Sequence, residues 1–502
     1  MNKPFILFCV LTLLLYARPA WERFSSSTQK APRFADYSSE RINPDEPPVM
    51  VETFISRDMG LGIVHAAAIC EMNDGTLAAV WYGGIREGGR DTAIYMSTHG
   101  PNTASSWSKP QVVADTSSTK KELKRFIRKI GNPVIFADAG NRLWLVYVTV
   151  SVGGWAGSSL NWKVSTDGGK SWTAARRLTL SPFINTSELV RNRPIPLSDG
   201  GFMIPIYHEA LGKFPEILWF RPDAEGKTLS YHKTRMSGGR SYIQPTVVPY
   251  DERSAVAFYR NCSGDRRVGR SVTSDAGRTW SRPKPLRVPN PDAALSALAL
   301  SDGRILLALN DSVKYRSNLR LLVSEKGSKS WERAATLEYE DGMEFSYPYM
   351  CRARNGRIHM VYTWRNGHIR HLEFNKAWLD ARMAAYQTLP EKSRDLVVEI
   401  FRVFKENAVD EARILAESFR HSALGLTAAL AEAEMRQIYR YALKAFYEAR
   451  GHLARLDACL ATAEDLGFLN TETIERLAGS LDAVTKELDG VIKDYEWYAR
   501  GH

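Results

Sequence analysis

The chain has 502 residues, with 67 Lys and Arg against 56 Asp and Glu, so its formal net charge is +11. Hydrophobic residues make up 44% and charged residues 25%, a globular balance that excludes a disordered chain, a collagen, a coiled-coil rod and a polytopic membrane protein. The charge is uneven, because residues 380–502 hold 16 basic and 21 acidic side chains, which leaves 51 basic and 35 acidic in residues 1–379. Two domains of different character are therefore expected.

The N-terminus has the pattern of a targeting segment. Lys3 is followed by a short apolar run over residues 5–16, and small residues stand near position 20. Such a pattern is typical of a secretory signal, and the run is short for a membrane span. We expect residues 1–20 to be a signal peptide or an uncleaved anchor that tethers the protein to a membrane. Residues 21–48 are expected to form a polar tether on a protein exported to the periplasm or the extracellular space.

The five cysteines are scattered along the chain. They stand at positions 9, 70, 262, 351 and 459, with no CxxC pair. That spacing argues against a zinc site and against a dense disulfide framework. For Cys70 and Cys351, two buried free thiols are expected, with a bridge that joins the first repeat to the last as the alternative. No metal or organic cofactor is indicated.

A short motif recurs in the first part of the chain. Residues 165–172 (STDGGKSW) are repeated at 273–280 (TSDAGRTW), and weaker copies stand at 324–331 and 97–107. In the two full copies the Asp is suited to cap turn amides, the Gly permits a tight bend, and the Trp packs between sheets. We expect a structural role for the motif rather than a catalytic one.

Short β-rich runs separate the copies, and many of them follow an Asp-Gly or Asn-Gly turn. Examples are 77–82, 143–150, 255–259, 305–309 and 358–363. Four-stranded units that repeat roughly every 50 residues are typical of a β-propeller. Over residues 49–379 this period predicts six blades, so the fold class is mainly β.

The repeated S-x-D-x-G-x-T-W motif resembles the Asp-box, or BNR repeat, of the sialidase (neuraminidase) superfamily. The similarity spans residues 55–378 and is greatest to the divergent bacterial sialidase-like branch. It implies an exported glycoside hydrolase of the exo-α-sialidase type, which acts on the acidic terminal sugars of a glycan or sialoglycoconjugate. Sialidases use Tyr as the nucleophile, because a carboxylate would be repelled by the substrate's own charge. The Tyr needs a neighbouring base, and a separate Asp serves as general acid/base.

The resemblance assigns roles to five residues. Asp91 follows the stretch Trp81-Tyr-Gly-Gly-Ile-Arg86 in a Gly-rich loop, and it matches the acid/base, while Arg86 lines the pocket. Arg260 and Arg316 match two arginines that bind the substrate carboxylate, a task suited to the planar guanidinium fork. Tyr347, in the stretch Phe-Ser-Tyr-Pro, matches the nucleophile.

Two positions depart from the family pattern. Gln244 stands where the family has the Glu that assists the Tyr, and Gln cannot accept a proton. His65 stands where the family has its first carboxylate-binding Arg; a protonated His still binds an anion, but its charge depends on pH. Arg191, Arg193 and Glu209, from the third unit, are expected to line the same pocket or to form surface ion pairs.

These departures leave two alternatives to a sialidase. The first is a propeller enzyme on another acidic saccharide, one containing uronic acid, with His65 as acid/base in hydrolysis or elimination. The second is a propeller that binds carbohydrate without catalysis.

The pattern changes to helical spacing in the tail. Leu396, Ile400 and Phe404 recur as on one helix face. The expected helices cover 392–407, 409–431, 433–466 and 472–497. Their short connections predict an up-down four-helix bundle over residues 390–500.

The tail also resembles known small proteins through residues 419–426 and 450–468. These are the four-helix-bundle proteins encoded in ribosomal RNA intervening sequences and the accessory proteins of diversity-generating retroelements. The resemblance implies self-association into a homo-oligomer, with docking onto the propeller as the alternative. Nucleic acid is not expected as a partner, because the tail is net negative.

Overall fold

A computed structural model describes two compact units, Met1–Met383 and Ala384–His502. The described residues are 33–35, 46–56, 59–86, 88–101, 106–181, 185–237, 239–325, 330–385, 388–406, 412–435 and 439–499. The predicted signal or anchor segment lies outside them, as does most of the predicted tether. Among the described residues, no helix combines the length and the apolar character needed to cross a membrane.

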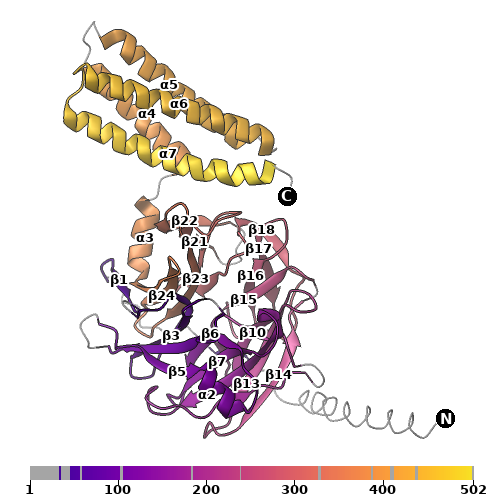
Figure 1. Cartoon of the computed structure of the whole chain (residues 1–502). Coiled ribbons are helices and arrows are strands. Elements are labelled where there is room, and N and C mark those ends of the chain that lie inside the picture. Colours follow the sequence, from indigo (N-terminus) through magenta and orange to yellow (C-terminus); the bar gives the residue numbers. More distant parts are fainter. Residues whose placement is uncertain are drawn as a thin grey trace, which may run out of the picture. The chain divides into compact units, whose positions relative to one another are not determined.

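The first unit is a six-bladed β-propeller, as predicted (Figure 1). Blade 1 contains β2 (Ile63–Glu71), β3 (Leu77–Gly84), β4 (Ala93–His99) and β5 (Gln111–Asp115). Blade 2 contains β6 (Lys129–Ala137), β7 (Leu143–Val150), β8 (Ser158–Ser165) and β9 (Arg176–Arg177). Blade 3 contains β10 (Leu189–Val190), β11 (Ile195–Pro196), β12 (Phe202–His208), β13 (Phe214–Pro222) and β14 (Leu229–Arg235).

The remaining blades follow the same antiparallel plan. Blade 4 contains β15 (Tyr242–Pro249), β16 (Ala255–Asn261), β17 (Arg267–Thr273) and β18 (Lys284–Pro289). Blade 5 contains β19 (Ser296–Ala299), β20 (Ile305–Leu309), β21 (Asn318–Ser324) and β22 (Glu332–Tyr339). Blade 6 contains β23 (Phe345–Arg352), β24 (Ile358–Trp364), β25 (His368–Phe374) and, at its outer edge, β1 (Met50–Phe54).

Two N-terminal segments pair with later blades. β1 pairs antiparallel with β25, so the start of the propeller completes its last blade and covers that sheet edge. Phe34, within the predicted tether, forms a β-bridge with Leu197 and is 1% exposed. This piece of the predicted tether therefore lies against the propeller.

Burial of the central strands on both faces explains why they appear in the sequence as continuous apolar runs. Every residue of β3 and β7 is buried, and Trp81 and Trp144 are fully enclosed. Blades pack against neighbours on both faces, so their central strands have no solvent-facing side to occupy with polar residues. The free Cys70 and Cys351 are both buried, which confirms the thiols rather than the bridge.

The repeated motif has the expected structural role. Asp167 Oδ1 accepts hydrogen bonds from Ser171 N at 2.9 Å and Ser165 Oγ at 2.8 Å, while Trp172 Nε1 donates to the Gly169 carbonyl at 3.1 Å. The second copy repeats these contacts through Asp275. Each motif follows the third strand of its blade, at the end opposite to the starts of the inner strands.

The second unit is a bundle of four helices, as predicted. They are α4 (Leu389–Glu406), α5 (Arg413–Met435), α6 (Tyr439–Asp465) and α7 (Thr471–Ala499). Their apolar faces form one buried core. Gly425 of α5 leaves space for His452 of α6, whose ring would lie 2.0 Å from a Cβ at that position.

Among the described residues, two further α-helices were not predicted. α2 (Thr116–Leu123) follows β5 and is capped by Asp115. α3 (Lys376–Ala385) follows β25 and buries Leu379 against blades 5 and 6. An ion pair from Arg304 to Asp380 fixes α3 to blade 5.

Candidate active site

The inner strands begin at one face of the propeller, and a residue with positive φ stands near each start. Four of these residues lie in β-bulges of β2, β6, β15 and β23. They are Ala66, Asn132, Gln244 and Tyr347, with φ of 53°, 44°, 52° and 56°. Ser187 and Asp292, with φ of 65° and 58°, precede β10 and β19. Positive φ is costly for non-glycine residues and bulges re-aim side chains, so we infer that this face carries the functional site.

Tyr347 lies among aromatic and cationic side chains on this face. Its ring centroid is 4.5 Å from that of His65, with the planes at 74°. The guanidinium carbons of Arg191 and Arg316 lie 5.3 Å and 5.7 Å from the Tyr347 ring centroid. The structure thus brings together four residues selected from the sequence, which come from four different blades.

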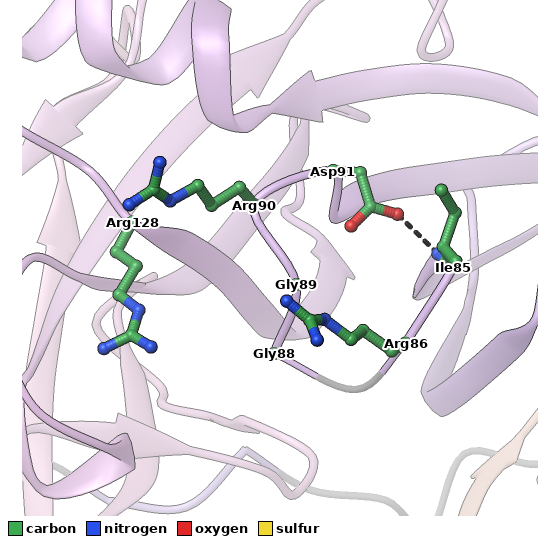
Figure 2. Close-up of a pocket in the computed structure, with 7 residues that line it drawn as sticks. All are labelled: Ile85, Arg86, Gly88, Gly89, Arg90, Asp91 and Arg128. Atoms are coloured by element: carbon green, nitrogen blue, oxygen red, sulfur yellow. Dashed lines mark hydrogen bonds between the residues drawn. The ribbon is translucent and has the colours of Figure 1, made fainter.

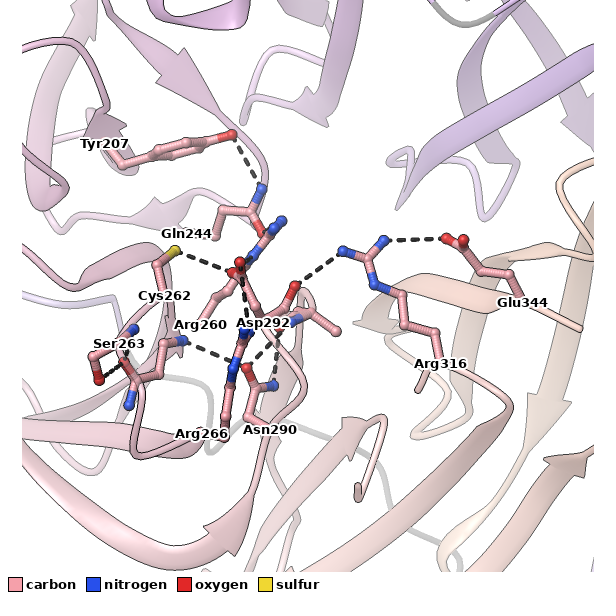
Figure 3. A network of polar contacts seen from close by, with 12 residues as sticks. Tyr207, Gln244, Arg260, Cys262, Ser263, Arg266, Asn290, Asp292, Arg316 and Glu344 are labelled. Atoms are coloured by element: carbon pink, nitrogen blue, oxygen red, sulfur yellow. Dashed lines mark hydrogen bonds and ion pairs between the residues drawn. The ribbon is translucent and has the colours of Figure 1, made fainter. Parts of the chain in front are cut away.

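A hydrogen-bonded network joins Arg260 to Gln244 and Tyr207 (Figure 3). Arg260 Nη1 donates to Gln244 Oε1 at 3.3 Å, and Gln244 Nε2 donates to the Tyr207 hydroxyl at 3.1 Å. Both ends of the Gln244 amide are therefore engaged. Gln244 positions the Arg260 guanidinium and, as an amide, accepts no proton from Tyr347.

Two carboxylates hold the paired arginines, and neither was selected from the sequence. Asp292 Oδ1 accepts from Arg260 Nε at 2.7 Å, and the Asp292 carbonyl accepts from Arg316 Nη2 at 2.9 Å. Glu344 Oε1 accepts from Arg316 Nη1 at 3.1 Å (Figure 3). Asp292 precedes β19 and Glu344 directly precedes β23, and only the position of Glu344, three residues before Tyr347, offered a signal.

The charges of this cluster reinforce one another. Burial favours the neutral form of Arg260, but the nearby Tyr347 and Asp292 outweigh it and raise the Arg260 pKa. Burial would raise the pKa of Asp292 and Glu344, but Arg260 and Arg316 respectively outweigh it and lower both. At neutral pH Arg260 and the two acids are therefore ionised.

His65 is buried and uncharged at neutral pH. It is 4% exposed, and burial lowers its pKa to about 4, with Arg316 and Arg191 lowering it further against the opposing Glu344. Its Nδ1 atom has no hydrogen-bond partner among the described residues. A neutral imidazole accepts a proton but supplies no positive charge for an anion.

Arg191 is almost fully enclosed, at 1% exposure. Its Nη1 donates to the Ala67 carbonyl at 3.1 Å, and its Nη2 donates to the Tyr347 and Pro348 carbonyls at 2.5 Å and 3.4 Å. Burial lowers its pKa to about 10, so it stays protonated at neutral pH. Arg191 therefore ties the bulges of β2 and β23 together.

Arg193 and Glu209 lie at different parts of the same unit. Arg193 interacts electrostatically with Tyr349 and Cys351, farther along β23 than Tyr347. Glu209 follows β12, its backbone N donates to Ser187 Oγ at 2.8 Å, and burial raises its pKa against the opposing Arg260. Glu209 thus lies near the arginine network, whereas Arg193 lies near residues that follow Tyr347 in β23.

Asp91 and Arg86 line a cavity of about 650 Å³ between the β3–β4 loop and Arg128 (Figure 2). Asp91 Oδ2 accepts a hydrogen bond from Ile85 N, and the Asp91 side chain is otherwise exposed. No recorded contact between described residues joins Asp91 directly to Tyr347. The acid/base assignment of Asp91 therefore remains a prediction.

A buried polar cluster lies in blade 3. Ligand atoms of Glu188, His208 and Glu216 lie within 4.8 Å of one another, a donor set that suits a divalent cation. Lys233 Nζ already bonds Glu188 Oε1 at 2.5 Å and Glu216 Oε2 at 3.2 Å. Burial raises the pKa of Glu188 to about 7 against the opposing Lys233. The Lys233 ammonium is thus the cation of this cluster.

Replacing Lys233 by Met is expected to lower the free energy of unfolding by about 3–5 kcal/mol, because it leaves two buried carboxylates without their cation. Urea denaturation at pH 7 measures the loss. Lys227→Met is the matched control, since Lys227 is an exposed lysine of the same blade. Equal stabilities of the two variants would contradict the prediction. A second change, Glu188→Gln, is expected to restore part of the loss.

The sequence matches two family models. Residues 75–360, more than half of the chain, match the model of the BNR repeat-like domain. Residues 387–490 match the model of the 23S rRNA-intervening sequence protein. Among curated proteins, no sequence matches this chain.

Solved structures share the propeller fold. The Hadza microbial sialidase Hz136 superposes with a TM-score of 0.54 at 16% identity, over 64% of this chain and 68% of that one. The intramolecular trans-sialidase from Ruminococcus gnavus gives a TM-score of 0.51 at 13% identity, over 65% and 97%. A protein of unknown function from Dyadobacter fermentans gives 0.52 at 13% identity, over 64% and 97%. The first unit shares the propeller fold of these sialidases. From its sequence match and its Asp-box propeller, the chain belongs to the BNR repeat-like domain family.

Proposed function

We propose that this protein is an exported, sialidase-like glycoside hydrolase that removes an acidic terminal sugar from glycans. The observation that carries the proposal is the position of Tyr347, which lies beside His65 and near the guanidinium groups of Arg191 and Arg316. A phenol in a cationic site suits a substrate that brings its own carboxylate, because a carboxylate nucleophile would be repelled.

Arg260 and Arg316 are proposed to bind the sugar carboxylate. Asp292 and Glu344 hold both guanidinium groups through the hydrogen bonds described above. Within the described residues, Arg260 Nη2 makes no hydrogen bond, so it is available to a ligand. Donors that are fixed before the substrate arrives need little reorganisation as charge develops.

The proposed reaction has two steps. The Tyr347 oxygen bonds to the anomeric carbon while the glycosidic C–O bond breaks, and Asp91 gives its proton to the leaving oxygen. His65 accepts the Tyr347 proton, a role that Gln244 cannot perform. In the second step water attacks the anomeric carbon and gives a proton to Asp91, while Tyr347 leaves and recovers its proton from His65.

One observation favours another acidic sugar as the second candidate. His65 replaces an arginine and carries no charge at neutral pH, and both Nη groups of Arg191 bind backbone carbonyls. The carboxylate then meets two arginines rather than three. This arrangement suits an enzyme for a uronic-acid saccharide, in which His65 is the central acid/base.

Fluorogenic substrates distinguish these functions. The purified full chain is expected to release the fluorophore from an α-sialoside at neutral pH. Release from a uronide but not from the sialoside would select the second candidate. Tight binding of an acidic saccharide without turnover of either substrate would leave only a carbohydrate-binding propeller.

A further inference from the structure

We propose that the cavity beside Asp91 is a subsite for a second anionic group of the substrate. The proposal rests on the proposed function and narrows its substrate class. The preferred ligand is a saccharide whose acidic terminal sugar is joined to a unit that bears a sulfate ester or a further carboxylate. Arg90 and Arg128, to which no role was assigned from the sequence, are the residues that recognise this second charge.

Three guanidinium groups share the cavity. They belong to Arg86 and Arg90 of the β3–β4 loop and to Arg128, just before β6 (Figure 2). Among the described residues, none of these three side chains has a recorded hydrogen bond or ion pair; Glu87 lies outside that set. The described lining holds these three arginines and one acidic residue, Asp91, so basic side chains are in excess and favour the binding of an anion. The guanidinium fork fits both carboxylate and sulfate oxygens.

The loop that carries two of these arginines is fixed in place. Gly89 N donates to the Arg86 carbonyl at 3.1 Å, which closes a turn. Thr92 Oγ1 donates to the Gly89 carbonyl at 3.1 Å and accepts from Ile130 N at 3.2 Å, so the loop is tied to blade 2. A Cβ on Gly89 would lie 2.2 Å from Asp91 Oδ1, and only glycine leaves the carboxylate its place. The subsite is therefore built before a ligand arrives.

A line of side chains connects the subsite to Tyr347. Lys129 Nζ would lie 2.9 Å from a Cβ on Gly88, and it stands 3.9 Å from the ring centroid of Trp155. The Trp155 ring is 6.1 Å from that of Tyr82, which is 5.9 Å from that of His65. His65 in turn contacts Tyr347. Trp155 is half-buried, so its exposed part offers a stacking surface for a sugar.

The charge of the propeller agrees with this substrate class. Residues 1–379 hold 51 basic against 35 acidic side chains, while the tail is net negative. A singly charged sugar needs only the arginines at Tyr347. The three arginines share their cavity with Asp91, the proposed acid for the leaving oxygen, and they would select for a second negative charge on the rest of the glycan.

Inorganic sulfate tests the subsite without any turnover. At constant ionic strength, sodium sulfate in place of chloride is expected to raise the melting temperature of the full chain. Arg90→Ala and Arg128→Ala are each expected to lose most of that increase. Arg278→Ala is the matched control, because Arg278 is an exposed arginine of the Asp-box loop on the opposite face. An equal loss in Arg278→Ala would overturn the proposal, since it would show general screening of surface charge.

Sugar affinity then tests the substrate class. Calorimetry on the Tyr347→Phe protein compares sialyllactose with its sulfated form and with disialyllactose. Either doubly charged ligand is expected to bind at least about tenfold more tightly, and Arg128→Ala is expected to remove most of that difference. Equal affinities for singly and doubly charged ligands, or tighter binding of an oligonucleotide, would overturn the subsite. If the protein binds doubly charged ligands much more tightly than singly charged ones but cleaves no glycoside, the proposed hydrolysis is refuted and the subsite is still supported.

Discussion

Replacing Tyr347 by Phe is expected to lower kcat/KM for the acidic glycoside by at least about 10³-fold, equivalent to about 4 kcal/mol of transition-state stabilisation. The ring that packs against His65 and near two guanidinium groups is retained. Only the attacking oxygen is lost, so the covalent intermediate cannot form. Steady-state fluorescence with the substrate that the full chain cleaves best measures the change.

Tyr349→Phe is the matched control for this prediction. Tyr349 stands two residues farther along the same strand, is fully buried, and its hydroxyl has no hydrogen-bond partner among the described residues. It is expected to retain activity within about threefold. A Tyr347→Phe protein as active as the control would exclude Tyr347 as the nucleophile, whatever sugar is cleaved.

The fold was predictable because its signals are local and repeated. Residues 165–172 and 273–280 fix turns by short-range hydrogen bonds, and such turns recur at the blade period. The tail was predictable from helical spacing, although the predicted helix ends differ from the observed ends by several residues. The helices α2 and α3 were missed because each is short. Leu379 is buried only because blades 5 and 6 lie beside it, which no local pattern reveals.

The site was predictable only in part. The order of motifs gave Arg260, Arg316 and Tyr347. The Arg316 guanidinium lies near the Tyr347 ring, and Asp292 accepts hydrogen bonds from both arginines. Asp292 and Glu344 could not be chosen, because an acid in a turn is common and its partners lie on other blades. The role of Arg191 depends on carbonyls exposed by two bulges, and a positive φ at a tyrosine has no sequence signal.

Replacing His65 by Gln is expected to lower kcat/KM by about 10² to 10⁴-fold, the range for loss of a general base. Burial holds the pKa of His65 at about 4, so the imidazole is in its proton-accepting form above that pH. The wild-type kcat/KM should therefore rise as the pH increases through about 4. In His65→Gln this acidic limb should vanish, because Gln does not titrate.

His359→Gln separates a base from a merely buried histidine. His359 is also 4% exposed, and burial also lowers its pKa to about 4, but it pairs with His371 in blade 6, away from Tyr347. The His359→Gln protein should keep the wild-type pH profile of kcat/KM. The double change His65→Gln, Gln244→Glu should recover part of the lost rate, since a carboxylate beside Arg260 accepts a proton where the amide does not. If His65→Gln kept full activity and the acidic limb, proton transfer from Tyr347 would have to go to Glu344, the other acceptor close to His65.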